Sequence, residues 1–313
     1  MDLLSNVLTK LKLSGTVYFR ASLISPWAIR LPNHDRAARF HFALKGACFV
    51  RIDGVPELLH LRQGDLLIIP HGNAHRMFCD PITEDHAVTI DSMIEDSGFD
   101  GTGVLVYGGH DPTLETQLLS GHFAFDVHAN HTLVQGLPKF IHVKDDDPVA
   151  GEWLLNSFRL LGGEAGSNRP GSDIIALKLA EIIFAQGLRS YIASDGAKRA
   201  GFAGFSDPNI RCALTAFHNN PAKIWTIEYM ANEAGMSRTS FAMRFVKLMA
   251  MTPMGYVVQW RMQLARQALA DTGLSLIEIA ESVGYQSEAA FTRAFKRLFN
   301  ETPAKFRRST QMN

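Results

Sequence analysis

The chain has 313 residues, 46% of them hydrophobic, and its formal net charge at neutral pH is zero. This length suits two domains, and the hydrophobic content allows each of them to bury a core. The sequence has no apolar run of about 18 residues and no cleavable signal pattern, so we expect a cytoplasmic protein that enters no membrane. Three widely separated cysteines, Cys48, Cys79 and Cys212, argue against a disulfide framework.

The zero net charge conceals an uneven distribution. The first 206 residues contain 18 Lys and Arg against 23 Asp and Glu, a net charge of −5. The residues from Asp207 onward contain 13 against 8, a net charge of +5. This division predicts an acidic regulatory part joined to a basic part suited to nucleic acid. Because the excess of +5 is modest, we expect salt-dependent DNA binding that needs two protomers.

Residues 1–150 carry the pattern of an all-β domain. From Tyr18 to about His142, short apolar runs are divided by Gly, Pro and Asp, which is typical of a barrel or a sandwich. Asp53-Gly54 lies between two such runs and predicts a hairpin turn.

A spaced motif in this domain, Gly64-x5-Pro70-x-Gly72-x2-His75, resembles the second motif of the cupin family. The resemblance implies a barrel with His75 directed into its mouth. The first cupin motif is incomplete, since His41 stands alone where metal-binding cupins carry a His-x-His pair. A catalytic metal needs three protein ligands and an open position. We therefore expect no metal, no cofactor and no catalysis, with His41 and His75 as candidate effector-binding residues.

Residues 151–194 are predicted to form a helical hairpin, with one helix over residues 152–161, a loop from Gly162 to Gly171, and a longer helix from Ser172. The apolar residues of the longer helix cover more than one face. One stripe can pack on the barrel and the other can meet a second protomer, although core packing alone would also explain the pattern. We expect a homodimer formed through this hairpin. Residues 195–206, rich in Gly, Ala and Ser, are assigned to an interdomain linker.

Two segments of the basic part, residues 226–249 and 275–299, repeat each other. Gly235 and Gly284 are 49 residues apart. Three later pairs are each 50 apart, so the second copy has one extra residue in its turn: Phe241 and Phe291, Phe245 and Phe295, Pro253 and Pro303. Each copy predicts a helix, a glycine-containing turn and a second helix. A duplicated helix-turn-helix is what a protein needs to read two segments of one DNA groove.

The helix boundaries in each copy follow from capping residues. Thr226, Ser237, Ser275 and Ser287 are predicted N-caps, and Glu278 is placed to complete a capping box with Ser275. Spacing by three and four predicts two inward-facing sets, Ile277, Ala280 and Val283 in one helix and Phe291, Phe295 and Leu298 in the next. Between the copies, residues 254–271 predict a connecting helix about 27 Å long, which would separate the two units by about one turn of DNA.

Three stretches carry a family resemblance: Ala231-x3-Gly235-Met236-Ser237, then Trp260-Arg261-Met262-Gln263-Leu264-Ala265-Arg266, and Ile279-Ala280-x3-Gly284-Tyr285-x-Ser287. Through them, residues 207–310 resemble the DNA-binding domain of AraC/XylS-type transcriptional regulators. The resemblance implies double-stranded DNA as the partner, bound at a bipartite major-groove site. It also implies that the N-terminal barrel senses a small-molecule effector, and that RNA polymerase is a further partner if the protein is an activator.

The position of residues within the motif predicts the DNA interface. The groove-facing residues are expected to be Arg238, Thr239, Ala242 and Met243 in the first unit and Glu288, Ala289, Thr292 and Arg293 in the second. Arg293 is suited to a bidentate guanine contact, and Thr239 and Thr292 can reach bases or thymine methyls. The remaining cationic residues are expected either to contact DNA phosphates or to lie on a solvent-exposed face: Arg244, Lys247, Lys296, Arg297, Arg307 and Arg308.

The predicted fold class is a multidomain α+β protein, with an all-β cupin-like barrel, a helical hairpin and an all-α domain containing two helix-turn-helix units. The predicted function is sequence-specific regulation of transcription, in which an effector changes dimerisation and promoter binding; activation and repression are both open. Two alternatives are a cupin enzyme with an appended DNA-binding module and a redox-sensing regulator that uses Cys48 and Cys79.

Overall fold

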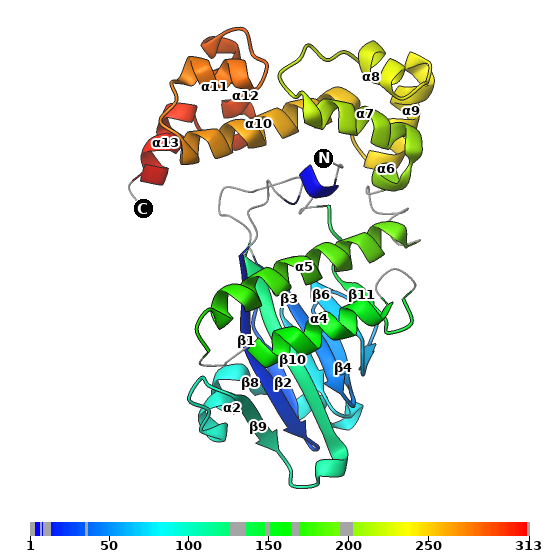
Figure 1. The fold of residues 1–313 in the computed structure, drawn as a ribbon, viewed down its shortest axis with the longest axis vertical. Helices are drawn as coiled ribbons and strands as arrows, with labels where there is room; N and C mark the ends of the chain where they lie inside the picture. The colour runs from blue at the N-terminus through cyan, green and yellow to red at the C-terminus, as the bar shows by residue number, and fades with distance from the viewer. Residues whose placement is uncertain are drawn as a thin grey trace. The chain divides into compact units, whose positions relative to one another are not determined.

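A computed structural model describes residues 4–6, 8, 14–34, 37–124, 136–147, 151–164, 169–194 and 203–311. The chain divides into two compact units, each with its own core. The N-terminal unit contains Leu13–Phe125 and Leu137–Ala193, and the C-terminal unit contains Ser194–Asn313 with Met1–Lys12 and Asp126–Gly136. Figure 1 shows strands in the first and helices in the second. Within the described residues, no helix is both long and apolar enough to span a membrane.

The strands of the N-terminal unit form two sheets. The six-stranded sheet contains, in spatial order, β11 (Ile141–Val143), β6 (Leu66–Ile69), β3 (Ala37–Lys45), β10 (Glu115–Ala124), β1 (Ser14–Ile24) and β9 (Val104–Gly108). The five-stranded sheet contains β5 (Leu59–Arg62), β4 (Ala47–Ile52), β7 (His75–Phe78), β2 (Ala28–Leu31) and β8 (Val88–Thr89). Neighbouring strands are antiparallel, except that β9 lies parallel to β1 and β8 lies parallel to β2.

The described residues thus confirm the predicted β-rich, cupin-like domain, but they form two sheets with open edges and not a closed barrel. The chain passes from β3 in one sheet to β4 in the other at Gly46, whose φ is +71°. A Cβ atom at this position would lie 2.6 Å from the Glu115 carbonyl oxygen, so only glycine fits the corner. The sharp corner puts these two consecutive strands in different sheets.

The six-stranded sheet is covered by helices on its outer face. Helices α4 (Gly151–Glu164) and α5 (Ser172–Ala193) both pack on this sheet, as Figure 1 shows. Phe42 of β3 stacks on Phe158 of α4 with ring centroids 3.8 Å apart, and Phe123 of β10 contacts Phe184 of α5. Since residues of β3 are buried on both faces, this strand has an almost continuous buried pattern rather than an alternating one.

Helix α4 is longer than the sequence predicts. It continues through Gly162 and Gly163, which the sequence analysis places in a loop. A Cβ atom at either glycine would meet nothing within 4 Å, so no close packing demands glycine there. A glycine inside a helix costs only about 1 kcal/mol relative to alanine, and the packing of α4 offsets this cost.

Three shorter helices connect the strands of the N-terminal unit: η1 (Pro81–His86), α2 (Ile90–Ser97) and η2 (Pro112–Leu114). Thr89 caps α2 by accepting a hydrogen bond from the Ser92 N–H at 3.2 Å. Met93 points from α2 into the core between the sheets and is fully buried. Helix α2 therefore closes one side of that core.

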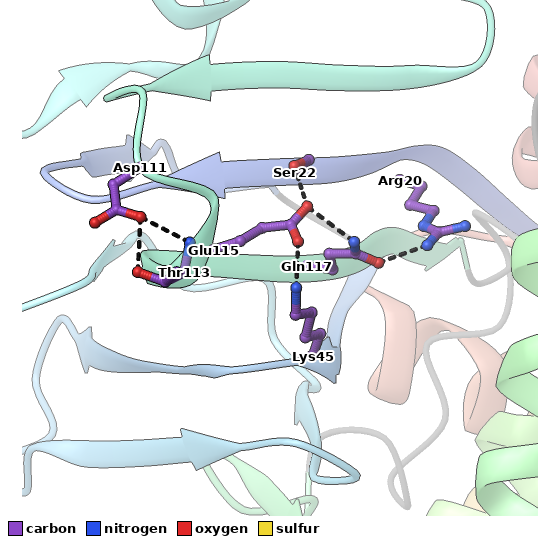
Figure 2. Close-up of polar contacts among 7 residues, drawn as sticks. All are labelled: Arg20, Ser22, Lys45, Asp111, Thr113, Glu115 and Gln117. Carbon is purple, nitrogen blue, oxygen red and sulfur yellow. Dashed lines mark hydrogen bonds and ion pairs between the residues drawn. The ribbon is translucent and has the colours of Figure 1, made fainter.

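A polar network ties β1, β3 and β10 together (Figure 2). The Glu115 carboxylate accepts hydrogen bonds from Lys45 Nζ at 2.7 Å, Ser22 Oγ at 2.5 Å and Gln117 Nε2 at 2.8 Å. These donors lower the pKa of Glu115 from 4.5 to about 2. The stabilisation is thus fully present above pH 4.5 and is lost as the pH falls through 2. The network is structural and lies outside the residues predicted to be functional.

The C-terminal unit is entirely helical in its described residues. Its helices are α6 (Ala203–Ser206), α7 (Pro208–Asn219), α8 (Ile227–Glu233), α9 (Arg238–Met249), α10 (Pro253–Asp271), α11 (Leu276–Ser282), α12 (Glu288–Phe299) and α13 (Pro303–Gln311). Helix α6 falls within the range assigned to the linker, of which residues 195–202 lie outside the described residues. Its Phe205 is buried, and a Cβ atom on Gly204 would lie 2.3 Å from Met249 Sδ. Residues 203–206 thus belong to the packed unit.

The predicted capping residues are confirmed. Thr226, Ser237, Ser275 and Ser287 each accept a hydrogen bond from the backbone N–H three residues later. The Glu278 carboxylate accepts a hydrogen bond from the Ser275 N–H at 2.7 Å, and this bond completes the predicted capping box. These bonds satisfy N–H groups that a helix leaves without an internal partner, and so they set where each helix begins.

Two of the predicted inward-facing residues are exposed instead. Ile277 of α11 is 38% exposed and Leu298 of α12 is 36% exposed. Their neighbours Ile279 and Phe299 contact the core in their place. The apolar stripe of a helix is more than 100° wide, so several adjacent residues satisfy the same periodicity and packing decides which one is covered.

Candidate DNA interface and effector cavity

Helices α9 and α12 carry all eight residues predicted to face a DNA groove. On α9, Arg238 and Thr239 are exposed, Ala242 is half-buried and Met243 is 70% exposed. On α12, Glu288, Ala289 and Arg293 are exposed and Thr292 is half-buried. Each helix buries the opposite face through two phenylalanines, Phe241 and Phe245 in α9 and Phe291 and Phe295 in α12. The structure thus leaves both predicted reading faces accessible.

The arginines of α9 form ion pairs within the unit. Arg238 Nε lies 2.8 Å from Glu228 Oε1 on α8. Arg244 donates from Nε at 2.9 Å and from Nη2 at 2.5 Å to Asp207 Oδ2, and the same aspartate caps α7. The sequence analysis does not predict either pair, because each joins residues on different helices. Arg244 therefore anchors α9 to α7.

The cations of α12 are arranged differently. Arg293, Lys296 and Arg297 are exposed and form no ion pair with side chains in the part of the chain that the structure describes. Farther along, Arg307 donates from Nη2 to the Leu274 carbonyl at 2.6 Å, so this arginine holds α13 against the loop before α11. Helix α12 thus presents cationic side chains that no carboxylate of the described residues neutralises.

Helix α10 serves both helix-turn-helix units. Tyr256 and Trp260, in its first half, contact Phe245 and His218 in the core of the first unit. In its second half, Met262, Ala265 and Leu269 belong to the core of the second unit. One continuous helix of 19 residues is therefore part of two cores.

In the N-terminal unit, His41 and His75 meet inside the core. Their Nε2 atoms lie 2.8 Å apart, and each residue is only 1% exposed. Burial lowers the pKa of His75 to about 4, and burial together with the charge of His75 lowers the pKa of His41 well below 6.5. Both rings are consequently neutral near pH 7.

The hydrogen bonds of the two rings determine where the protons lie. His75 Nδ1 is 2.9 Å from the Asn73 carbonyl oxygen, which can only accept, so Nδ1 is protonated and Nε2 is not. His41 Nε2 must then donate to His75 Nε2. His41 Nδ1 accepts from Ser120 Oγ, which lies at 2.9 Å. The result is a chain of donors that runs in one direction from Ser120 to the Asn73 carbonyl.

This arrangement does not fit a cupin metal centre. Within the described residues, no group of three or more His, Cys, Asp or Glu side chains is placed to hold a metal ion. The two histidines supply one nitrogen each, and those two nitrogens are hydrogen-bonded to one another. A catalytic zinc site takes three protein ligands. No metal-dependent step can be derived from these residues.

A cavity of about 260 Å³ lies beside His41. Most of its walls are apolar, and they come from both sheets and from α2: Leu23, Ile29, Leu31, Met93, Ile94 and Leu118. One polar region is formed by Arg39, His41 and Ser120, and Asp91 of α2 also lines the cavity. Arg39 is only 6% exposed. The structure thus offers an apolar chamber with hydrogen-bonding groups at one place.

The sequence analysis predicts His41 and His75 as candidates for effector binding. Of these, His41 lines the cavity, whereas His75 contacts His41 without lining it, and the sequence analysis misses Arg39 and Ser120. Arg39 lies two residues before His41 on the same strand, and side chains two apart share one face of a sheet. That periodicity could have identified Arg39. Ser120 lies opposite His41 in the pairing of β3 with β10, which sequence periodicity does not reveal.

These features define a DNA-binding protein with two helix-turn-helix units and a β-rich domain that contains a ligand-sized cavity. Residues 2–193 match the cupin family, and residues 230–309 match a helix-turn-helix domain family. An AraC-like transcription regulator of Streptomyces lividans is 32% identical over the whole of both chains. The regulator AlkR of Acinetobacter baylyi is 30% identical over 99% of this chain and 100% of its own.

Among solved structures, the DNA-binding domain of AdpA in complex with a target DNA is 25% identical. It covers 34% of this chain and 95% of that domain, with a TM-score of 0.33. The full-length relatives show the family: the chain belongs to the AraC-type DNA-binding transcriptional regulators that carry an N-terminal cupin domain.

Proposed function

We propose that a small molecule binds in the 260 Å³ cavity and thereby changes how this regulator dimerises and binds promoters. The cavity is the observation that carries the proposal, because it combines apolar walls with a few polar groups, as ligand sites in proteins do. Arg39 can donate hydrogen bonds to an acceptor on the ligand, whereas neutral His41 carries no charge. We expect a mostly apolar effector with one hydrogen-bond acceptor.

The strands that line the cavity also support the outer helices. Ligand binding in the cavity can therefore change the packing of those helices. On β3, Arg39 and His41 face the cavity, while Phe40 and Phe42 face the other way and contact Phe158 of α4. A shift of β3 on ligand binding would therefore change the packing of α4. Contiguous packing of this kind is a physical means of coupling two surfaces.

The helical hairpin is proposed as the dimer contact. Four large apolar side chains are exposed on it: Leu160 of α4 and Ile174, Ile175 and Ile182 of α5. Other apolar residues of α5, such as Ile183 and Phe184, are fully buried. Core packing alone thus does not account for all of the apolar surface of α5. A second protomer covering it would bury the exposed isoleucines.

The DNA contact is proposed to be a bipartite major-groove site, read by α9 and α12 with the residues predicted from the sequence. Arg238, Thr239, Ala242 and Met243 would read the first segment, and Glu288, Ala289, Thr292 and Arg293 the second. Lys247, Lys296 and Arg297 would contact phosphates, and Arg244 could do so only by leaving Asp207. Contact with RNA polymerase follows if the bound protein activates transcription.

The test of effector binding uses the full-length protein. Small molecules released on denaturing the purified protein are identified by mass spectrometry, and each is tested for its effect on melting temperature and promoter binding. Ala21→Leu, which places a larger side chain in the cavity, is expected to abolish both responses while leaving ligand-free DNA binding intact. Full responses in this variant would place the effector site elsewhere. Stoichiometric iron or zinc with turnover would instead support a cupin enzyme.

Redox sensing is a second candidate because of the position of two cysteines. Antiparallel pairing of Phe49 with Phe78 brings Cys48 of β4 next to Cys79, the residue that follows β7. Cys79 is half-buried, and its sulfur accepts hydrogen bonds from the Trp27 N–H and the Ser25 hydroxyl. Burial raises the pKa of the Cys48 thiol, which opposes its reaction. An unchanged oxidant response of a target promoter in Cys48→Ser and Cys79→Ser would remove this candidate.

A further inference from the structure

Arg261 links the two helix-turn-helix units directly, in addition to the helix that joins them. It follows Trp260, which belongs to the first core, and precedes Met262, which belongs to the second. Its Nε donates to the Pro221 carbonyl at 2.8 Å and its Nη2 donates to the Lys223 carbonyl at 2.7 Å. Both acceptors lie in the loop that enters the first unit.

The same guanidinium reaches the turn of the second unit. Arg261 Nη1 lies 3.5 Å from the Gly284 carbonyl oxygen. A Cβ atom on Gly284 would lie 2.6 Å from Arg261 Nη2 and 2.6 Å from the Ala222 carbonyl oxygen. The loop before α8 and the turn before α12 are therefore packed against each other, with the guanidinium between them.

The chemistry of this contact favours arginine. Arg261 is half-buried, and burial lowers its pKa. In the described part of the chain its hydrogen bonds go to carbonyl oxygens, and none of its contacts is an ion pair. A planar guanidinium presents several donors in fixed directions, whereas a lysine ammonium is a single point. Only arginine can hold carbonyl groups of both segments at once.

Without this contact, the two units would be held by their packing on α10 and by the approach of Ala222 to Gly284, and each could pivot more freely around that helix. The sequence analysis attributes the separation of the two units to the length of the connecting helix. That length sets how far apart the units lie, but it does not set the angle between them.

We propose that Arg261 is a positioning residue that fixes the angle between α9 and α12 and thereby selects the spacing of the two DNA segments that the protein accepts. Arg261 faces the loop and the turn rather than the reading faces, so it acts on DNA through the orientation of the recognition helices. The inference rests on the proposed bipartite contact with DNA. Loss of the Arg261 side chain is expected to relax the spacing requirement while leaving contact with each DNA segment intact.

The first experiment uses DNA selected by the full-length protein from a randomised duplex library. Binding is measured to the selected duplex, to duplexes with one base pair added or removed between the two segments, and to each segment alone. We expect the natural protein to prefer the selected spacing by about tenfold, since deforming DNA or losing one contact costs that much. Arg261→Met is expected to reduce the preference below about twofold, with segment binding nearly unchanged.

Two variants control this measurement. Arg211→Met removes an exposed arginine of α7 in the same unit, and it is expected to keep the full spacing preference. Arg261→Lys keeps the charge and most of the length, and it is expected to behave like Arg261→Met. A spacing preference in Arg261→Lys equal to that of the natural protein would overturn the proposal. If the natural protein binds the selected duplex no better than one segment alone, the bipartite contact itself is wrong.

A second measurement needs no DNA and therefore tests the angle directly. Spin labels are attached at Lys247 of α9 and Lys296 of α12, each replaced by cysteine, with Cys79 and Cys212 replaced by serine. The distribution of distances between the labels is expected to broaden in Arg261→Lys and to remain narrow in Arg211→Met. Equal distributions in all three proteins would also overturn the proposal.

Discussion

The two helix-turn-helix units share one architecture but present different chemistry to DNA. Both have serine or threonine caps, a glycine in the turn with positive φ, and a pair of buried phenylalanines on the second helix. On the predicted reading face, α9 offers Ala242, an exposed Met243 and an arginine paired with Glu228. Helix α12 offers Thr292 and Arg293, and Arg293 forms no ion pair within the described residues. Residues that build the fold have been kept in both copies, and residues that face outward have diverged.

This difference indicates unequal roles in recognition. A guanidinium that forms no ion pair with the described residues, such as that of Arg293, can donate two hydrogen bonds to guanine without breaking any described ion pair. Arg238 must first leave Glu228, so part of its binding energy is spent on breaking that ion pair. We expect the second unit to contribute hydrogen-bonded base recognition and the first to contribute shape and methyl contacts.

The largest expected effect is from Arg293→Ala. Loss of a bidentate contact is expected to weaken binding by about 1–3 kcal/mol and to relax specificity at one base pair. Binding is measured against a set of duplexes with each base of the selected site replaced in turn. Lys296→Ala is the matched control. It is expected to weaken binding to all duplexes equally and to lower the number of ions released on binding by about one. Equal losses for every sequence in Arg293→Ala would show that Arg293 contacts only phosphate.

A smaller effect is expected from removing the caps of the two units. Ser275→Ala is expected to lower the free energy of unfolding by about 1 kcal/mol, and more than Thr226→Ala does, because only Ser275 belongs to a capping box. Urea unfolding of both variants is the measurement. Equal losses would mean that the hydrogen bond from the Ser275 hydroxyl to Glu278 adds nothing to the cap.

The capping difference is also expected to depend on pH. Hydrogen bonds from the Ser275 side chain and backbone lower the pKa of Glu278 below 4.5. The contribution of the Glu278 carboxylate is therefore present above pH 4.5 and is lost as the pH falls through its lowered value. The two alanine variants should converge in stability on acidification, and a constant difference would contradict this assignment.

The smallest expected effect comes from Glu228→Gln, and it has the opposite sign. Releasing Arg238 is expected to strengthen DNA binding by about two- to threefold, since exposed ion pairs are weak. Fluorescence anisotropy at low salt would measure the gain, with Glu281→Gln on α11 as the matched change of charge. Weaker binding in Glu228→Gln would show that the pair orients Arg238 for DNA rather than withholding it.

Most of the C-terminal unit could be predicted from the sequence. Caps, glycine turns and apolar spacing depend on residues within a few positions of each other, and each predicted helix of both repeats is present in the structure. The errors were at Ile277 and Leu298, where local spacing allows several faces and only packing chooses one. In the N-terminal unit the strands could be predicted, but the two open sheets could not, because strand pairing joins segments far apart in the chain.

The sequence by itself determined the duplicated helix-turn-helix, the helix ends and the membership of a DNA-binding family, because these depend on local hydrogen bonds and on residue spacing. Only the tertiary structure brought Arg39, His41 and Ser120 to one cavity and His75 against His41. It also paired Arg238 with Glu228 and placed Arg261 between two loops. These contacts join residues on different strands and helices, so their existence depends on how the elements pack. The repeat therefore predicts two helix-turn-helix units, and the packing around α10 determines how these units are placed relative to each other.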